Sequence, residues 1–215
     1  MRSLRPRGWL SLRTIALLFP IQEHALSRPP VLDETHLTAE QHVVFDDIRS
    51  GPRGLVEGPL RVWLQSPAFA ERAQKLGAFC RYGTRIPARL SELAIVTVGA
   101  HWRSGFEWSV HAPIAAKAGI DSEVLEAIRA GARPSFIRAD ERAVYRFSQE
   151  LLETKRVSED AYQEVVELVG TEGAVELVGI LGYYTLICMT INAFEVPTAD
   201  GKPEPFQVGE SAERR

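Results

Sequence analysis

Two adjoining apolar segments between Ser91 and Gly119 constrain the fold of this 215-residue chain more than any other feature. The first ends near Trp102 and the second begins near Gly105, with only a short turn between them. The first contains the β-branched run AIVTVGA, which by composition alone is also compatible with a strand. Because the neighbouring segments all have helical periodicity and no second strand pattern is present to pair with this one, we predict a helix here.

Helix-start and helix-stop signals extend the helical prediction to most of the chain. Thr38 and Gln41 have the spacing of a capping box, so a helix is expected from there to about Arg49. Further helices are expected to begin at prolines or capping residues, and Gly119 is expected to end the second apolar helix. These starts are Pro59, Pro67, Pro87, Asp121, Asp140, Ser158 and Thr171. We therefore predict an all-α bundle with a leader at 1–36, one helical domain at 37–197 and a mobile tail at 198–215.

The composition is that of an ordinary globular domain, with 45% hydrophobic residues, 25% charged residues and a formal net charge of −3. Residues 1–28 hold five arginines and one acid, so the remainder is more acidic than the whole, which argues against a nucleic-acid partner. The start resembles a targeting peptide only loosely, because its apolar run is short and broken by Pro20. We expect a disordered leader or a misassigned start codon there.

The uncharged stretch from Leu177 to Phe194 is long enough to be mistaken for a membrane span. It contains glycine, threonine and asparagine and lacks flanking Lys or Arg anchors, so we predict a core or subunit-interface helix and no membrane partner. Cys80 and Cys188 belong to no disulfide or metal pattern and are predicted to be buried, reduced thiols. This cysteine usage predicts a cytoplasmic location.

A carboxylate and an imidazole one helical turn apart form the clearest candidate site. Glu107 and His111 are four residues apart, which places both on one otherwise apolar face of the second helix. Such a pair suits proton transfer, since the carboxylate can fix the imidazole tautomer and raise its pKa. Two simpler interpretations stay open: His111 as a buried core residue, and Glu107 as a solvent-facing partner of Arg103.

The order of these residues resembles the carboxymuconolactone decarboxylase family over about residues 37–197. The residues that carry the resemblance are Glu92, Ser104, Glu107, Trp108 and His111, followed by Ala-Gly-Ile. The related alkylhydroperoxidase D has a glutamate, a Cys-x-x-Cys pair and a histidine at the same intervals. This chain has Ser104 and Glu107 at the positions of the two cysteines. The resemblance is therefore to the branch that lacks the thiol pair.

That resemblance implies an alkylhydroperoxidase D-like helical fold, a homo-oligomer (trimer or hexamer), and cofactor-free decarboxylation or isomerisation of a small carboxylated lactone or keto acid. It implies that His111 is the general acid, that Glu107 positions it, and that Glu92 faces the pocket as further support. From the residues alone, Glu92 is also compatible with a salt bridge to Arg89 or Arg85. No metal site is expected, because the acid–histidine spacing is one residue longer than in di-iron bundles and occurs once.

Four further residues are expected to bind the small-molecule substrate. These are Trp102, Trp108, Ser104 and Arg85. Arg85, together with Arg81, is placed to clamp a substrate carboxylate, although surface solvation is an equally good role. Ser104 also suits a helix N-cap, and the tryptophans also suit core packing. Two alternatives to a lyase remain: an alkylhydroperoxidase-like activity, disfavoured by the missing thiol pair, and a non-catalytic helical oligomer.

Overall fold

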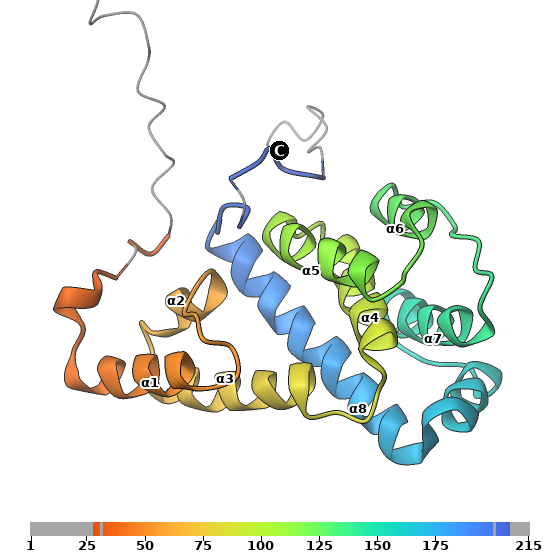
Figure 1. Ribbon diagram of the computed structural model, residues 1–215, viewed down its shortest axis with the longest axis horizontal. Helices are drawn as coiled ribbons and strands as arrows, with labels where there is room; N and C mark the ends of the chain where they lie inside the picture. The colour runs from red at the N-terminus through yellow and green to blue at the C-terminus, as the bar shows by residue number, and fades with distance from the viewer. Residues whose placement is uncertain (1–27, 31, 200, 207–215) are drawn as a thin grey trace, which may run out of the picture.

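The computed structural model describes residues 28–30, 32–199 and 201–206, and all regular structure within them is helical (Figure 1). In this part of the chain a 3-10 turn at Glu34–His36 precedes eight α-helices. They are α1 (Ala39–Ser50), α2 (Pro59–Trp63), α3 (Pro67–Tyr82), α4 (Ala88–His101), α5 (Gly105–Lys117), α6 (Ser122–Arg129), α7 (Ala139–Thr154) and α8 (Glu159–Ala193). The predicted all-α class is confirmed, and the AIVTVGA run lies inside α4.

Local capping interactions explain where the helices begin. The Thr38 hydroxyl accepts from the Gln41 backbone N–H while the Gln41 side chain accepts from the Thr38 N–H, which completes the predicted capping box before α1. Asp121 and Ser158 cap α6 and α8 by accepting from the backbone N–H groups of Glu123 and Ala161. Gly170 has φ 74° and ψ 172°, so α8 is broken there, one residue before the predicted start at 171.

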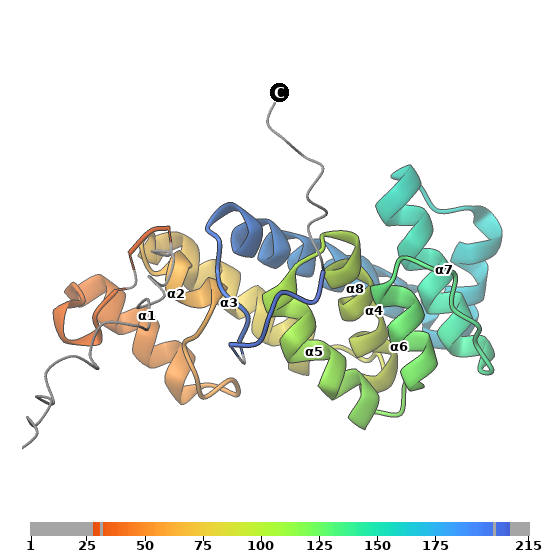
Figure 2. The ribbon, with the colours of Figure 1, turned by 90° about the horizontal axis from the view of Figure 1, so that it is seen from above.

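The core is organised around α4, which packs against α5, α7 and α8. Residues Leu93, Ala94 and Ile95 of α4 are completely buried. Figures 1 and 2 show α1–α3 at one end of the molecule and α6 and α7 at the other, with α8 running between the two ends. The two carboxylate-bearing helices predicted from the sequence, α4 and α5, therefore lie in the middle of the fold.

Helix α8 is the one helix in the described residues that is long and apolar enough to cross a membrane, judged by length and composition only. In the structure 56% of its most apolar 18-residue window is buried, and it packs against α3, α4 and α7. Leu177 and Ile180 have no exposed surface. These contacts agree with the prediction of a core helix for the uncharged stretch.

Part of the tail predicted to be mobile from residue 198 onward is described, and it contacts the helices. Phe206 is only 4% exposed and stacks edge-on against Trp108, with ring centroids 5.5 Å apart. The Arg129 guanidinium donates to the Pro205 carbonyl at 2.8 Å. Residues 201–206 therefore lie against α5 and α6, because one aromatic side chain at 206 gives them an apolar anchor. Most of the predicted leader, residues 1–27, lies outside the described residues.

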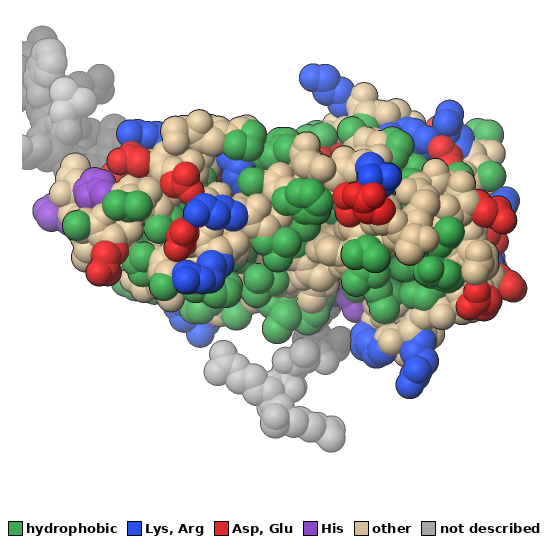
Figure 3. Space-filling view, turned by 90° about the horizontal axis from the view of Figure 1, so that it is seen from below, with side chains coloured by type: hydrophobic (Ala, Val, Ile, Leu, Met, Phe, Trp, Pro, Cys, Tyr) green, Lys and Arg blue, Asp and Glu red, His purple; other side chains and the backbone are tan. Residues whose placement is uncertain are grey.

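The surface is only partly polar. Figure 3 shows hydrophobic side chains over the middle of one face, with charged side chains toward both ends. Large exposed apolar residues occur on both α3 and α8. They include Phe69, Leu76, Phe79, Val175 and Val178. The trimer or hexamer implied by the family resemblance stays a prediction.

Candidate active site

The turn between α4 and α5 brings Glu92 and His111 together. The backbone N–H of Trp102 donates to Val98 and that of Ser104 donates to Gly99, which closes the end of α4. Arg103 takes a left-handed conformation, φ 50°, so the chain reverses within three residues. The two helices then pack side by side.

His111 lies between two carboxylates in a buried environment. Its Nδ1 is 2.7 Å from Glu92 Oε2 and its Nε2 is 3.0 Å from Glu107 Oε1. The three residues are 2%, 8% and 3% exposed for His111, Glu92 and Glu107. The Nδ1 contact has hydrogen-bond geometry, whereas the Nε2 contact is at ion-pair distance without such alignment, so Glu107 Oε1 has no aligned donor among the described residues.

These carboxylates set the protonation of His111. Burial alone would lower the pKa of His111, but the charges of Glu107 and Glu92 outweigh it, so this pKa is raised above its ordinary value. Since an ionised carboxylate can only accept hydrogen bonds, Nδ1 is the donor to Glu92. The arrangement therefore stabilises an imidazolium whose Nε2 side faces Glu107.

This geometry bears on two of the simpler interpretations open at the sequence level. Glu107 is buried and does not face solvent, and Glu92 pairs with His111 instead of Arg89 or Arg85. Arg89 is held by Asp140 and Glu141. Burying three charged groups costs desolvation free energy, which their mutual contacts offset.

A cavity of about 220 Å³ adjoins His111 and Glu107. Its walls come from the loop before α2 and from α2, α3, α5 and α8, so residues distant in sequence enclose it. Tyr184 of α8 places its ring edge-on against the His111 ring, with centroids 5.2 Å apart. The Tyr184 hydroxyl is buried without a hydrogen-bond partner among the described residues, and burial raises its pKa well above the ordinary value. Glu92 does not line the cavity, so it acts on the cavity only through His111.

Two arginines also line this cavity. Arg81 comes from the end of α3, as the sequence allowed, but Arg53 comes from the loop between α1 and α2 and was not predicted. The only sequence signal at Arg53 is the breaker-rich GPRG loop, since functional side chains often sit on loops held by a rigid scaffold. Arg53 Nη2 donates to the Tyr183 hydroxyl at 3.1 Å.

The four residues predicted to bind substrate do not line the cavity. Trp108 packs in a separate apolar cluster with Phe206, and Trp102 packs against the main core. Arg85 forms an ion pair with Glu172. Ser104 is fully buried at the N-cap of α5 and makes no side-chain capping bond. The side chains that could touch a molecule beside His111 are therefore different from those predicted.

Both cysteines are buried and free, as expected. Cys188 lies one turn beyond Tyr184 on α8. Burial raises the pKa of the Cys188 thiol, the charge of Glu107 acts in the same direction, and the Ser104 side chain opposes them more weakly. Burial also raises the pKa of Cys80. Neither thiol lines the cavity beside His111.

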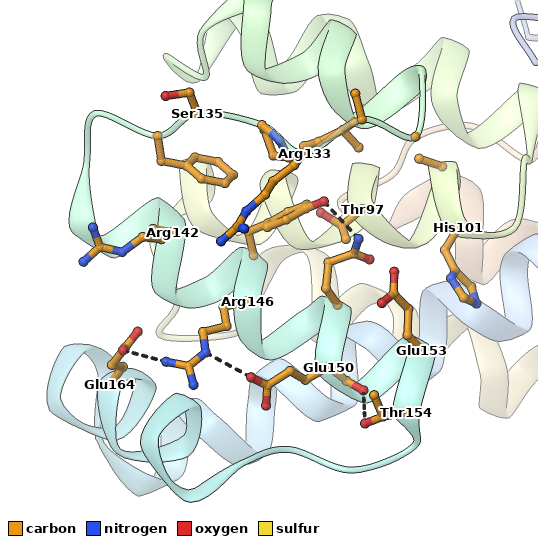
Figure 4. Close-up of a pocket in the computed structure, with 18 residues that line it drawn as sticks. Thr97, His101, Arg133, Ser135, Arg142, Arg146, Glu150, Glu153, Thr154 and Glu164 are labelled. Atoms are coloured by element: carbon orange, nitrogen blue, oxygen red, sulfur yellow. Dashed lines mark hydrogen bonds and ion pairs between the residues drawn. The ribbon is translucent and has the colours of Figure 1, made fainter.

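A larger cavity of about 880 Å³ lies between α4, α7 and the first half of α8 (Figure 4). It contains His101, whose pKa is lowered by burial and by the charge of Lys155. Its central arginine, Arg146, is neutralised by Glu150 and Glu164, as the dashed lines in Figure 4 show. No group of three or more His, Cys, Asp or Glu within the described ranges is arranged to hold a metal ion.

Comparisons with known proteins identify the fold. No family model and no curated protein matches the sequence. Among solved structures, an alkylhydroperoxidase AhpD core protein from Ralstonia eutropha JMP134, described as peroxidase-related, has a TM-score of 0.66 at 14% identity, covering 82% of this chain and 94% of its own. The chain has the alkylhydroperoxidase D-like fold.

Two other solved structures share this fold. A peroxidase-related protein from Silicibacter sp. TM1040 has a TM-score of 0.63 at 14% identity, covering 87% of this chain and 99% of its own. The debrominase Bmp8, in a complex with 2,3,4-tribromopyrrole, has a TM-score of 0.63 at 14% identity, covering 86% and 95%. Since one fold supports many reactions, the reaction has to be inferred from the site itself.

Proposed function

We propose that the chain is an enzyme that transfers protons to and from carbon in a small carbonyl acid, by general acid–base catalysis and without a cofactor. The observation that carries this proposal is the imidazole of His111, buried between Glu92 and Glu107 at the wall of a cavity. The raised pKa of the imidazole favours its charged, proton-donating form. The family resemblance points to the same chemistry.

We propose different tasks for the two carboxylates. Glu92 accepts from Nδ1 and does not line the cavity, so it is a positioning residue that holds the ring and favours its charged form. Glu107 and the Nε2 side of His111 both line the cavity. Glu107 therefore serves as the base and Nε2–H as the acid, whereas the sequence assigned the positioning role to Glu107.

The reaction we propose is decarboxylation or the related isomerisation. When a carboxylate is lost as CO2, its bonding electron pair remains on the substrate as a dienolate, and the Nε2–H proton is then transferred to carbon. Neutral His111 regains a proton from solvent. In an isomerisation, Glu107 instead removes a proton next to the carbonyl group, and Nε2–H protonates another carbon. The low-dielectric walls strengthen the interaction between the imidazolium and the developing negative charge.

The test is a screen of small lactone acids and keto acids in D2O, with NMR detection of deuterium bound to carbon and of CO2 release. We expect turnover by the wild-type protein, none by His111→Gln, and reduced turnover by Glu92→Gln with its pH profile moved to lower pH. Circular dichroism verifies that each variant is folded. If folded His111→Gln is as active as wild type, the proposal is wrong. Adding 2,3,4-tribromopyrrole to the screen tests the chemistry of the structurally similar debrominase.

A further inference from the structure

Arg53 places a positive charge inside the cavity that adjoins His111. Its side chain is half-buried, it lines the cavity, and its Nη2 donates to the hydroxyl of Tyr183. The Nε of Arg53 is buried without a hydrogen-bond partner among the described residues. Among the same residues, no carboxylate forms an ion pair with Arg53, and the Glu107 carboxylate pairs with His111. A guanidinium that is fixed in place but not neutralised is suited to bind an anion.

The packing under Arg53 holds it in this position. Gly77 of α3 lies directly below the Tyr183 hydroxyl, and a Cβ at that position would be 2.0 Å from this oxygen and 2.5 Å from Arg53 Nη2. The missing side chain makes room for the Tyr183–Arg53 contact. Tyr183 is 2% exposed, and burial raises its pKa to about 12, so its hydroxyl stays protonated and neutral. Arg53 is therefore held by a neutral partner, which leaves its charge available.

We propose that Arg53 anchors the carboxylate of an organic monoanion in this cavity and thereby determines the substrate's charge class. This inference rests on the proposed function and adds the residue that recognises the substrate. Arg81 lines the same cavity and brings a second guanidinium group to it. Glu57 and Glu107 also line the cavity, but among the described residues neither forms an ion pair with Arg53, so the Arg53 guanidinium favours an anion over a neutral or cationic molecule of the same shape.

The rest of the lining limits the size and shape of the anion. The side chains of Leu60, Val110 and Ile187 contribute apolar surface to the lining. A cavity of about 220 Å³ accommodates a single small ring or a short unsaturated chain. The substrate class is thus a small, largely apolar carboxylate with its charged end at Arg53 and its reacting carbon toward His111.

Binding of matched acids and amides tests this proposal without requiring turnover. Benzoate and 2-furoate are compared with benzamide and 2-furamide by calorimetry and by following the His111 ring signals in NMR. Wild-type protein should bind each carboxylate about tenfold or more tightly than its amide, because only the carboxylate satisfies the desolvated guanidinium. Arg53→Gln should weaken carboxylate binding by about tenfold or more and leave the amide affinity unchanged. Arg53→Lys, which keeps the charge but loses the planar fork, should fall between the two.

Arg72→Gln is the matched control, because Arg72 is an exposed arginine of α3 that pairs with Glu71 and does not line the cavity. It should bind all four probes as wild type does. The proposal is overturned if acids and amides bind equally, if no carboxylate binds, or if folded Arg53→Gln and Arg53→Lys both keep full carboxylate affinity. Should Arg53→Gln fail to fold, Arg53→Lys decides. Exchange of carbon-bound hydrogen for deuterium is measured separately. If carboxylates bind in a way that depends on Arg53 but no deuterium is incorporated, the proposed function is contradicted and this inference is supported.

Discussion

Replacing Gly77 with alanine tests whether close packing beneath Tyr183 builds the cavity. Gly77 is a buried residue inside α3, where glycine costs about 1 kcal/mol relative to alanine, so this replacement at an unconstrained site would stabilise the helix. A Cβ at Gly77 would, however, lie 2.0 Å from the Tyr183 hydroxyl oxygen and 2.2 Å from its Cζ. Tyr183 is enclosed by the core and cannot move without displacing its neighbours.

The expected magnitude follows from two opposing effects. Overpacking a close-packed interior costs about 1–3 kcal/mol, and better helix propensity offsets about 1 kcal/mol of this. We therefore expect Gly77→Ala to lower the free energy of unfolding by up to about 2 kcal/mol. Gly182→Ala is the matched control, because Gly182 is an exposed residue of α8 whose added Cβ would meet nothing within 4 Å. The free energy of unfolding of that variant should rise by about 0.5–1 kcal/mol. The same glycine-to-alanine replacement is therefore expected to destabilise the protein in α3 and to stabilise it in α8.

Urea unfolding followed by circular dichroism measures both variants against wild type at one protein concentration. For a chain of this length each kcal/mol corresponds to about 2–4 °C in Tm, so thermal unfolding resolves the difference as well. Gly77→Ala should also weaken benzoate binding, because Tyr183 and Arg53 shift together. A Gly77→Ala protein that is at least as stable as wild type and binds benzoate with unchanged affinity would refute this reasoning.

Three further predictions concern residues outside this contact. Glu92→Gln removes one carboxylate that raises the pKa of His111, so the NMR titration of His111 should move to lower pH. In wild type, protonated His111 contributes its full stabilisation below its ordinary pKa of 6.5, and this contribution is lost as pH rises through the raised folded-state pKa. Glu92→Gln should therefore reduce the free energy of unfolding mainly below that raised pKa. Trp63→Phe removes a buried hydrogen bond of 2.9 Å to Thr190 and should cost about 1–3 kcal/mol in urea unfolding. Thr38→Ala removes the capping box of α1 and should cost about 1 kcal/mol, whereas Thr38→Ser should retain most of it.

The helices could be predicted because their ends depend on short-range chemistry. Short-range interactions within four residues act at Thr38 with Gln41, at the proline that begins α2 and at the capping Ser158, so the sequence shows them directly. Which face of a helix is buried depends instead on what packs against it. Phe69, Leu76 and Phe79 have helical apolar spacing in α3, yet all three are more than 40% exposed. Local pattern therefore located this helix without identifying its contacts.

The residues of the candidate site also fall into those that local sequence signals predict and those that only the packing reveals. Glu107 and His111 are one turn apart, so their proximity follows from helix geometry. Glu92 was placed beside His111 by the family resemblance, since α4 residues carry no local signal for a partner on α5. Arg53 reaches the cavity only because α2 and α3 pack against α8, and the role of Gly77 is visible only once Tyr183 is in place. The predicted homo-oligomer and cytoplasmic location stay predictions.

Local electrostatics favour acid–base chemistry over thiol chemistry in this version of the fold. The thiolate is the reactive form of cysteine, but burial raises the pKa of Cys188, and the charge of Glu107 raises it further. The same charge raises the pKa of His111. One carboxylate therefore raises the pKa of both groups, which favours the proton-donating form of the imidazole and, together with burial, disfavours the reactive thiolate of Cys188. The family resemblance places a cysteine of the thiol-containing branch at position 107, so this chain has a carboxylate where that resemblance expects a thiol, and its charge acts on the pKa values of the neighbouring groups.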